Sequence, residues 1–154
     1  MEKNKIVKIG CASAFWGDTS SAAPQLVYSG KIDYLVFDYL AEVTMSILAG
    51  AKLKNTDMGY ATDFVKHMSP LLSEVKKRGI KVISNAGGIN PEACRAAVME
   101  EAKNAGVKLN IALVKGDNLV DQKKQLQALP VTELETGKTM PDAVSYTHLR
   151  AHET

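Results

Sequence analysis

Small and polar residues follow four apolar, β-branched runs of the chain, and these are the residues whose types could do chemistry. The four clusters span residues 10–18, 38–42, 84–90 and 116–117. In parallel α/β folds, ligands bind at the carboxyl ends of the strands, because loops and helix N-termini bring polar groups together there. We therefore expect one shared site along a sheet edge that carries Asp18, Asp38, Asn85 and Asp117.

Carboxylates in the first two clusters are the candidates for acid–base chemistry. Asp18 ends the first cluster, and Asp38 and Glu42 stand four residues apart at an expected helix start. Two carboxylates on one helix turn can divide acid and base roles or bind a divalent cation. The structural alternative is that Asp38 caps the helix and Glu42 complements its dipole. We predict Asp18, Asp38 and Glu42 as catalytic residues and assign no metal ligands.

The first cluster also has the composition of a ligand loop. Small residues let the backbone approach a ligand, successive amides can form an anion nest, and Trp16 offers an aromatic wall. The loop lacks both the GK[ST] ending of a P-loop and the GxGxxG spacing of dinucleotide sites. The alternative is a tight strand-to-helix connection with Trp16 in the core. We predict Ser13, Trp16 and Gly17 as ligand-binding residues.

The third cluster combines glycines with an expected helix start at Asn90 and Pro91. Unpaired N–H groups at such a start favour a phosphate, carboxylate or thioester oxygen, although any strand-to-helix turn also needs a glycine and a cap. The fourth cluster gives a weaker signal of the same kind, and His67 is expected on a helix face. The further residues predicted to bind ligand are Asn85, Gly87, Gly88, Asn90 and Asp117.

Alternating strand and helix patterns place these clusters in an α/β fold with a parallel sheet of βα units. A Rossmann-like open sheet is favoured over part of a β/α barrel, and helices are expected to bury both sheet faces. The expected strands are residues 6–9, 34–37, 80–84 and 109–114. The expected helices are residues 24–29, 40–54, 61–78 with a break at Pro70, 91–105 and 118–126.

Composition excludes several classes of function. The 154 residues carry a net charge of +2 without a basic patch, which argues against nucleic acid as a partner. No apolar run reaches the roughly 18 residues of a membrane span, and the polar start lacks a signal peptide. Two cysteines in unlike contexts indicate no disulfide framework. We expect a cytoplasmic protein.

The last eleven residues, VSYTHLRAHET, depart from the pattern of the rest. They match one reading frame of a transposase adapter used in DNA sequencing libraries. We therefore expect residues 144–154 to be a non-native tail and residues 1–143 to be the truncated amino-terminal α/β domain of a longer protein. The alternative is a genuine polar tail. A metal site that used the tail residues His148 and His152 would be an artefact.

Several motifs in order resemble one protein family over about residues 5–117. They are IGCASAFWGDT, YLVFDYLAEVTMSIL, GYATDF and KVISNAGGINPEAC. This part of the chain resembles the amino-terminal part of the acyclic terpene utilisation (AtuA-like) family, whose members are longer.

The resemblance implies a role in the breakdown of acyclic terpenes, a pathway that runs on coenzyme A thioesters. The function it implies is an enzyme part that acts on a branched acyl-CoA or an organic acid, with its reaction type and cofactor unassigned. The alternatives are a non-catalytic ligand-binding or assembly subunit, with a homo-oligomer or a partner subunit, and an inactive truncated fragment.

Overall fold

Three parallel strands form the sheet in the computed structural model, which describes residues 6–117 and 119–139. The strands are β1 (Ile9–Ser13), β2 (Tyr34–Phe37) and β3 (Lys81–Ser84), and they lie side by side in the order β1–β2–β3. Phe37 pairs with Ser13 on one side and with Ser84 on the other, so all three strands end at the same edge. The predicted α/β class with an open parallel sheet is confirmed.

The first strand begins three residues later than predicted. Ile6 and Ile9 are 80% and 67% exposed, whereas Gly10 and Ala12 face the helices. A Cβ atom at Gly10 would meet the Leu26 side chain at 3.0 Å. Close approach of a helix therefore selects small residues in β1, and the prediction that the apolar run at 6–9 is the strand is wrong.

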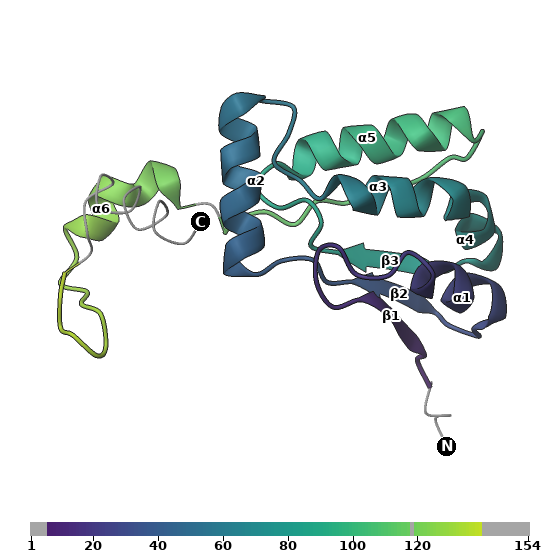
Figure 1. Ribbon diagram of the computed structural model, residues 1–154, viewed down its shortest axis with the longest axis horizontal. Helices are drawn as coiled ribbons and strands as arrows, with labels where there is room; N and C mark the ends of the chain where they lie inside the picture. The colour runs from purple at the N-terminus through teal and green to yellow at the C-terminus, as the bar shows by residue number, and fades with distance from the viewer. Residues whose placement is uncertain (1–5, 118, 140–154) are drawn as a thin grey trace, which may run out of the picture. The chain divides into compact units, whose positions relative to one another are not determined.

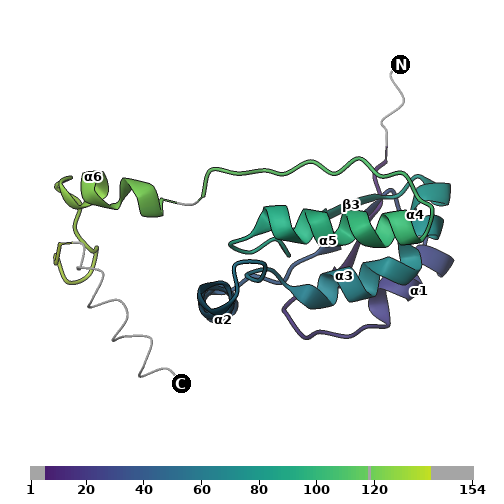
Figure 2. The ribbon, with the colours of Figure 1, turned by 90° about the horizontal axis from the view of Figure 1, so that it is seen from above.

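Helices connect the strands and follow the last one (Figure 1). The chain forms α1 (Ala22–Ser29), α2 (Glu42–Lys54), α3 (Thr62–Met68), the 3-10 turn η1 (Ser69–Leu71), α4 (Leu72–Arg78) and α5 (Pro91–Asn104). The predicted break at Pro70 is confirmed, since η1 interrupts the helical stretch there. Figure 2 shows α3 and α5 side by side, and Figure 1 shows α2 standing at the carboxyl end of the strands.

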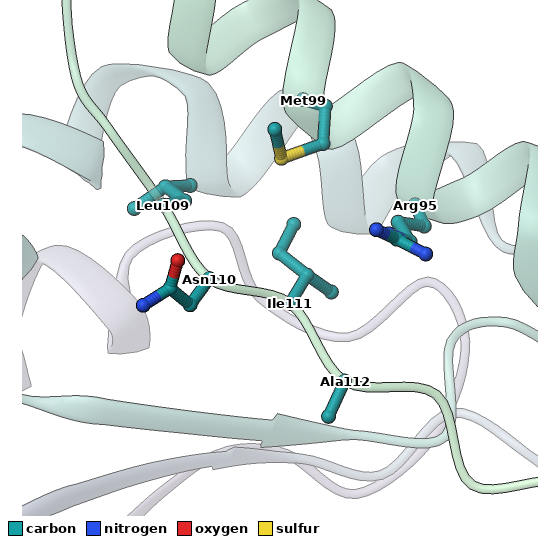
Figure 3. Close-up of a pocket in the computed structure, with 6 residues that line it drawn as sticks. All are labelled: Arg95, Met99, Leu109, Asn110, Ile111 and Ala112. Atoms are coloured by element: carbon teal, nitrogen blue, oxygen red, sulfur yellow. The ribbon is translucent and has the colours of Figure 1, made fainter.

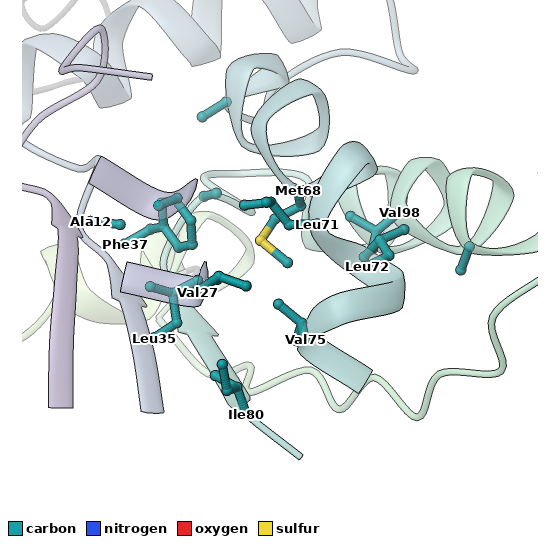
Figure 4. Packing of buried hydrophobic residues seen from close by; sticks show 14 of the residues in the cluster. Ala12, Val27, Leu35, Phe37, Met68, Leu71, Leu72, Val75, Ile80 and Val98 are labelled. Atoms are coloured by element: carbon teal, nitrogen blue, oxygen red, sulfur yellow. The ribbon is translucent and has the colours of Figure 1, made fainter. Parts of the chain in front are cut away.

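The core lies between one face of the sheet and the helices α1, α3, α4 and α5 (Figure 4). Leu35 and Phe37 of β2 are 0% and 2% exposed and form its centre. Burying one such side chain contributes roughly 1.5–3 kcal/mol to stability. From the helices, the core receives Ala23, Val27, Met68, Leu71, Leu72, Val75, Val98 and Ala102.

No helix within residues 6–113 covers the opposite face of the sheet, whereas the prediction placed helices on both faces. Ile9 and Ile83 on this face are 67% and 55% exposed, and Cys11 is exposed as well. Each crossover between parallel strands is right-handed. When successive strands are added on the same side, as in the order β1–β2–β3, the connecting helices therefore lie on one face of the sheet. In doubly wound folds the other face is covered by helices from strands added in the opposite direction.

The predicted fourth strand at residues 109–114 does not form. Residues 107–113 are extended and alternate between half-buried and exposed positions, as a strand would, but they pair with no strand among the described residues. Leu109 and Ile111 instead pack against the core. Every second side chain of this segment is half-buried, as the sequence predicts. A segment can bury alternate side chains in this way without hydrogen bonds to a neighbouring strand.

The chain divides into two compact units, and the second begins at Val114. It contains the 3-10 turn η2 (Val120–Gln122) and α6 (Lys123–Gln127), shorter than the predicted helix. A turn with Gly137 at φ 65° brings Thr132 and Thr139 into an antiparallel bridge. The predicted tail at 144–154 lies outside the described residues. None of the described helices combines the length and apolar character needed to cross a membrane.

Candidate functional site

Asp38 and Asn85 meet at the carboxyl edge of the sheet, as their positions directly after β2 and β3 predict. The Asn85 Nδ2 atom donates a hydrogen bond of 2.7 Å to Asp38 Oδ1. The Asn85 Oδ1 atom accepts a hydrogen bond of 2.8 Å from the Tyr39 backbone N–H. One amide thus ties the end of β3 to the segment after β2 and holds an exposed carboxylate in a defined orientation.

The expectation that Asp38 caps α2 is wrong. The helix begins at Glu42, and its N-cap residue Ala41 has extended backbone angles and makes no side-chain cap. Asp38 lies three residues before that position, and its carboxylate is engaged by Asn85. Glu42 stands exposed in the first turn of α2, where its negative charge complements the helix dipole. Asp38 therefore does not have the capping role, and its catalytic role stays a prediction.

Ser13 joins the ends of the first two strands. Its Oγ atom donates to the Asp38 carbonyl oxygen at 3.3 Å, and the Asp38 N–H donates to the Ser13 carbonyl oxygen at 3.3 Å. Ser13 is 5% exposed. These contacts place it directly beneath Asp38, and its predicted role in ligand binding stays a prediction.

Asp18 closes the loop after β1 upon itself. Its carboxylate accepts hydrogen bonds from the backbone N–H groups of Ala14, at 3.0 Å, and Thr19, at 2.7 Å. These two bonds lower the pKa of Asp18, so the carboxylate is ionised at neutral pH. A group held in that state can accept a proton only weakly and has none to donate, which favours a loop-forming role.

Asp18→Asn should loosen this loop, because the amide oxygen accepts more weakly than a carboxylate. Hydrogen exchange at the Ala14 and Thr19 N–H groups should accelerate at pH 7. Since folding lowers the pKa of Asp18, its stabilisation is present above the unfolded pKa of about 3.9 and disappears as the pH falls through the lower folded value. Glu42→Gln is the control, and equal exchange rates in both variants would contradict this role.

Trp16 fastens the same loop to α3. Its Nε1 atom donates to Asp63 Oδ2 at 3.1 Å, and its ring packs against the core. Asp63 also pairs with Lys66 at 3.4 Å. The neighbouring Gly17 has a φ of +94° and open space around its Cα, as a turn on the surface requires. These contacts fit the tight-connection alternative, and ligand binding by Trp16 and Gly17 remains a prediction.

Tyr39 is a site residue that sequence reasoning missed. It is 1% exposed, and its Oη atom lies 3.5 Å from His67 Nδ1 on α3. Burial raises the pKa of Tyr39 to about 12, although a hydrogen bond with Ser13 opposes that effect. The phenol is therefore neutral and can only donate or accept hydrogen bonds. The spacing could have indicated it, because Leu35, Phe37 and Tyr39 are each two residues apart and all three are buried on the same side of the chain.

The glycine loop after β3 turns its amides inward. The N–H groups of Gly88 and Asn90 donate to Asn85 O at 3.1 Å and Gly87 O at 2.9 Å. The Ile89 N–H donates to Gly59 O at 3.0 Å, and Lys52 Nζ donates to Ile89 O at 2.8 Å. These three amides are thus committed within the chain rather than presented to a ligand.

Asn90 binds the connection between α2 and α3. It is 9% exposed, and its Nδ2 atom donates to Thr56 O at 2.9 Å and Met58 O at 2.8 Å. Both amide hydrogens are therefore used inside the protein. The predicted ligand contacts of Gly87, Gly88 and Asn90 stay predictions, and Asp117 belongs to the second unit, where its predicted role is equally open.

Other reactive groups lie apart from this edge. Burial raises the pKa of the Cys94 thiol to about 11, which makes it inert at neutral pH. No group of three or more His, Cys, Asp or Glu residues in the described ranges is placed to hold a metal ion. A cavity of about 330 Å³ lies between α5 and residues 109–112 (Figure 3), and none of the predicted site residues lines it.

Comparison with known proteins gives one family. The protein-family model described as "Acyclic terpene utilisation family protein AtuA" matches residues 7–152. That range includes most of the predicted tail, and the boundary at residue 143 stays a prediction. Neither curated proteins nor solved structures gave a significant match. The match spans nearly all of the chain, Asp38 and Asn85 included, and the chain belongs to the acyclic terpene utilisation family AtuA.

Proposed function

We propose that this chain is part of a cytoplasmic catabolic enzyme that acts on the coenzyme A thioester of a branched acid. Family membership supports the pathway. The observation that carries the site is the hydrogen bond of 2.7 Å between Asn85 and Asp38, which orients a carboxylate at the carboxyl edge of a parallel sheet. In this proposal Asp38 is the base and Asn85 is a positioning residue.

The charge at this edge favours a neutral carbonyl over a carboxylate as the group that lies beside Asp38. The loops at residues 14–21, 38–41 and 85–90 contain Asp18 and Asp38, and the Lys52 ammonium group beside them donates a hydrogen bond to Ile89 O. A free carboxylate would be repelled by the two aspartates, whereas the carbonyl of a thioester is neutral. A positioned carboxylate can take the proton from the carbon next to that carbonyl. Proton abstraction by Asp38 is therefore the reaction step that we propose.

Asp38→Asn should slow this step while leaving the fold intact, because the exposed side chain keeps its size. Incubation with isovaleryl-CoA in heavy water should replace the protons next to the thioester carbonyl by deuterium, which nuclear magnetic resonance detects. The variant should slow this exchange by about a hundredfold or more, the usual contribution of general base catalysis. Glu100→Gln removes an exposed carboxylate on α5 and should leave the exchange rate unchanged.

A non-catalytic ligand-binding subunit is the second candidate. It is favoured by the lowered pKa of Asp18, since a carboxylate fixed by backbone bonds is suited to shaping a loop rather than to proton transfer. The same incubation separates the two functions when binding is followed by calorimetry. Binding without deuterium exchange would contradict the enzyme proposal and support the subunit, and the loss of both would fit an inactive fragment.

A further inference from the structure

A second ligand site is indicated by the cavity beside α5, away from the predicted site residues. One wall is formed by Arg95 and Met99 of α5, and the other by residues 109–112 (Figure 3). Its volume of about 330 Å³ is near the lower end of the range for pockets that bind small molecules. The space therefore suits a compact molecule.

Four of the six residues that line this cavity are apolar, and the other two are Arg95 and Asn110. Ile111 points from the extended segment toward Met99, and Leu109 lies beside it (Figure 3). Leu109 and Ile111 also pack against the core, which fixes their positions, whereas Met99 is 38% exposed. The unbranched thioether of methionine adapts its shape to a hydrocarbon group. A short aliphatic chain matches these walls.

Arg95 supplies a positive charge at the same cavity. Its guanidinium group lies on the cavity side of α5 (Figure 3), and it forms no ion pair within the described ranges. Other cations are paired, as Arg78 of α4 is with Glu74 and Lys103 of α5 is with Glu100. A guanidinium group without a carboxylate partner can bind an added carboxylate through two parallel hydrogen bonds.

We propose that this cavity binds a short-chain aliphatic monocarboxylate, with Arg95 as the partner of the carboxylate and Met99, Leu109 and Ile111 around the hydrocarbon chain. The proposal goes beyond the function of the Asp38 edge and does not depend on it. The ligand needs both its carboxylate and its aliphatic chain. The Arg95 guanidinium is exposed, and an exposed ion pair alone contributes little to binding. The apolar contact therefore supplies the selectivity for the chain.

The test uses the whole chain and three probes in calorimetry: isocaproate, its uncharged amide, and acetate. Isocaproate should bind saturably, its amide about threefold to fivefold more weakly, and acetate about tenfold more weakly or not at all. Arg95→Gln should weaken isocaproate binding about threefold to fivefold, the scale of one exposed ion pair. Lys103→Gln, which removes a charge from the same helix outside the cavity, should bind isocaproate as the parent chain does.

Met99→Trp is the second variant, since it keeps Arg95 but fills the cavity, and it should abolish isocaproate binding. Circular dichroism checks that each variant is folded. The absence of saturable isocaproate binding, or binding that neither Arg95→Gln nor Met99→Trp weakens, would overturn the proposal. Asp38→Asn should leave isocaproate binding unchanged, so this site and the proposed function can fail separately.

Discussion

Gly88→Val should destabilise the chain by about 2–5 kcal/mol, the combined scale of left-handed backbone strain and of overpacking a core. Gly88 has a φ of +54°, and a Cβ atom there would lie 2.4 Å from Leu48 Cδ1 and 2.8 Å from the Gly59 carbonyl oxygen. The carbonyl belongs to the backbone and cannot rotate away. Urea unfolding followed by circular dichroism measures the loss directly.

Gly50→Ala is the matched control for that substitution. Gly50 lies inside α2, and its added Cβ atom would meet nothing within 4 Å. Because alanine favours helix over glycine, this variant should gain up to about 1 kcal/mol. A Gly88→Val protein as stable as its parent would mean that the glycine loop is open, as the anion-binding interpretation of its sequence supposed.

Asn90→Ala should cost about 2–4 kcal/mol, because it leaves two backbone carbonyls without their buried donor. The Asn90 side chain is buried, and it holds Thr56 O and Met58 O at once. Its removal should also free the connection between α2 and α3. Urea unfolding gives the energy, and hydrogen exchange across residues 56–61 shows where the structure loosens.

Asn85→Ala provides the comparison, since Asn85 also makes two hydrogen bonds but stands exposed at the sheet edge. Water can replace those bonds, so the loss should be about 1 kcal/mol or less. If the two variants were equally stable, burial would not be what gives Asn90 its importance, and its assignment as a structural residue would fail.

Local sequence patterns predicted the parts of the fold that depend on neighbouring residues. The strand at Tyr34–Phe37 follows from a continuous apolar run. The break at Pro70 follows from the proline ring, and the helix end at Gly79, whose φ is 68°, follows from the left-handed backbone that glycine allows. The contact between Asp38 and Asn85 also follows from a simple rule. Parallel strands end at the same edge of the sheet, and each of these residues directly follows a strand.

Features that depend on distant residues could not be predicted in this way. The start of β1 is set by Leu26 packing on Gly10, and the direction of the glycine-loop amides is set by acceptors such as Gly59. Asn90 looks like a helix cap in the sequence, yet its amide is engaged by carbonyls more than thirty residues away. Spacing along the chain carries no information about such partners.

The uncovered face of the sheet has a practical consequence for chemical labelling. Cys11 is exposed on that face, whereas Cys94 is on the buried side of α5 with a raised thiol pKa. A maleimide reagent at neutral pH should therefore modify Cys11 alone and place a single fluorophore on the bare side of β1. The alkylation rate of this thiol therefore measures how accessible the sheet face is, and it would fall whenever another surface covered that face.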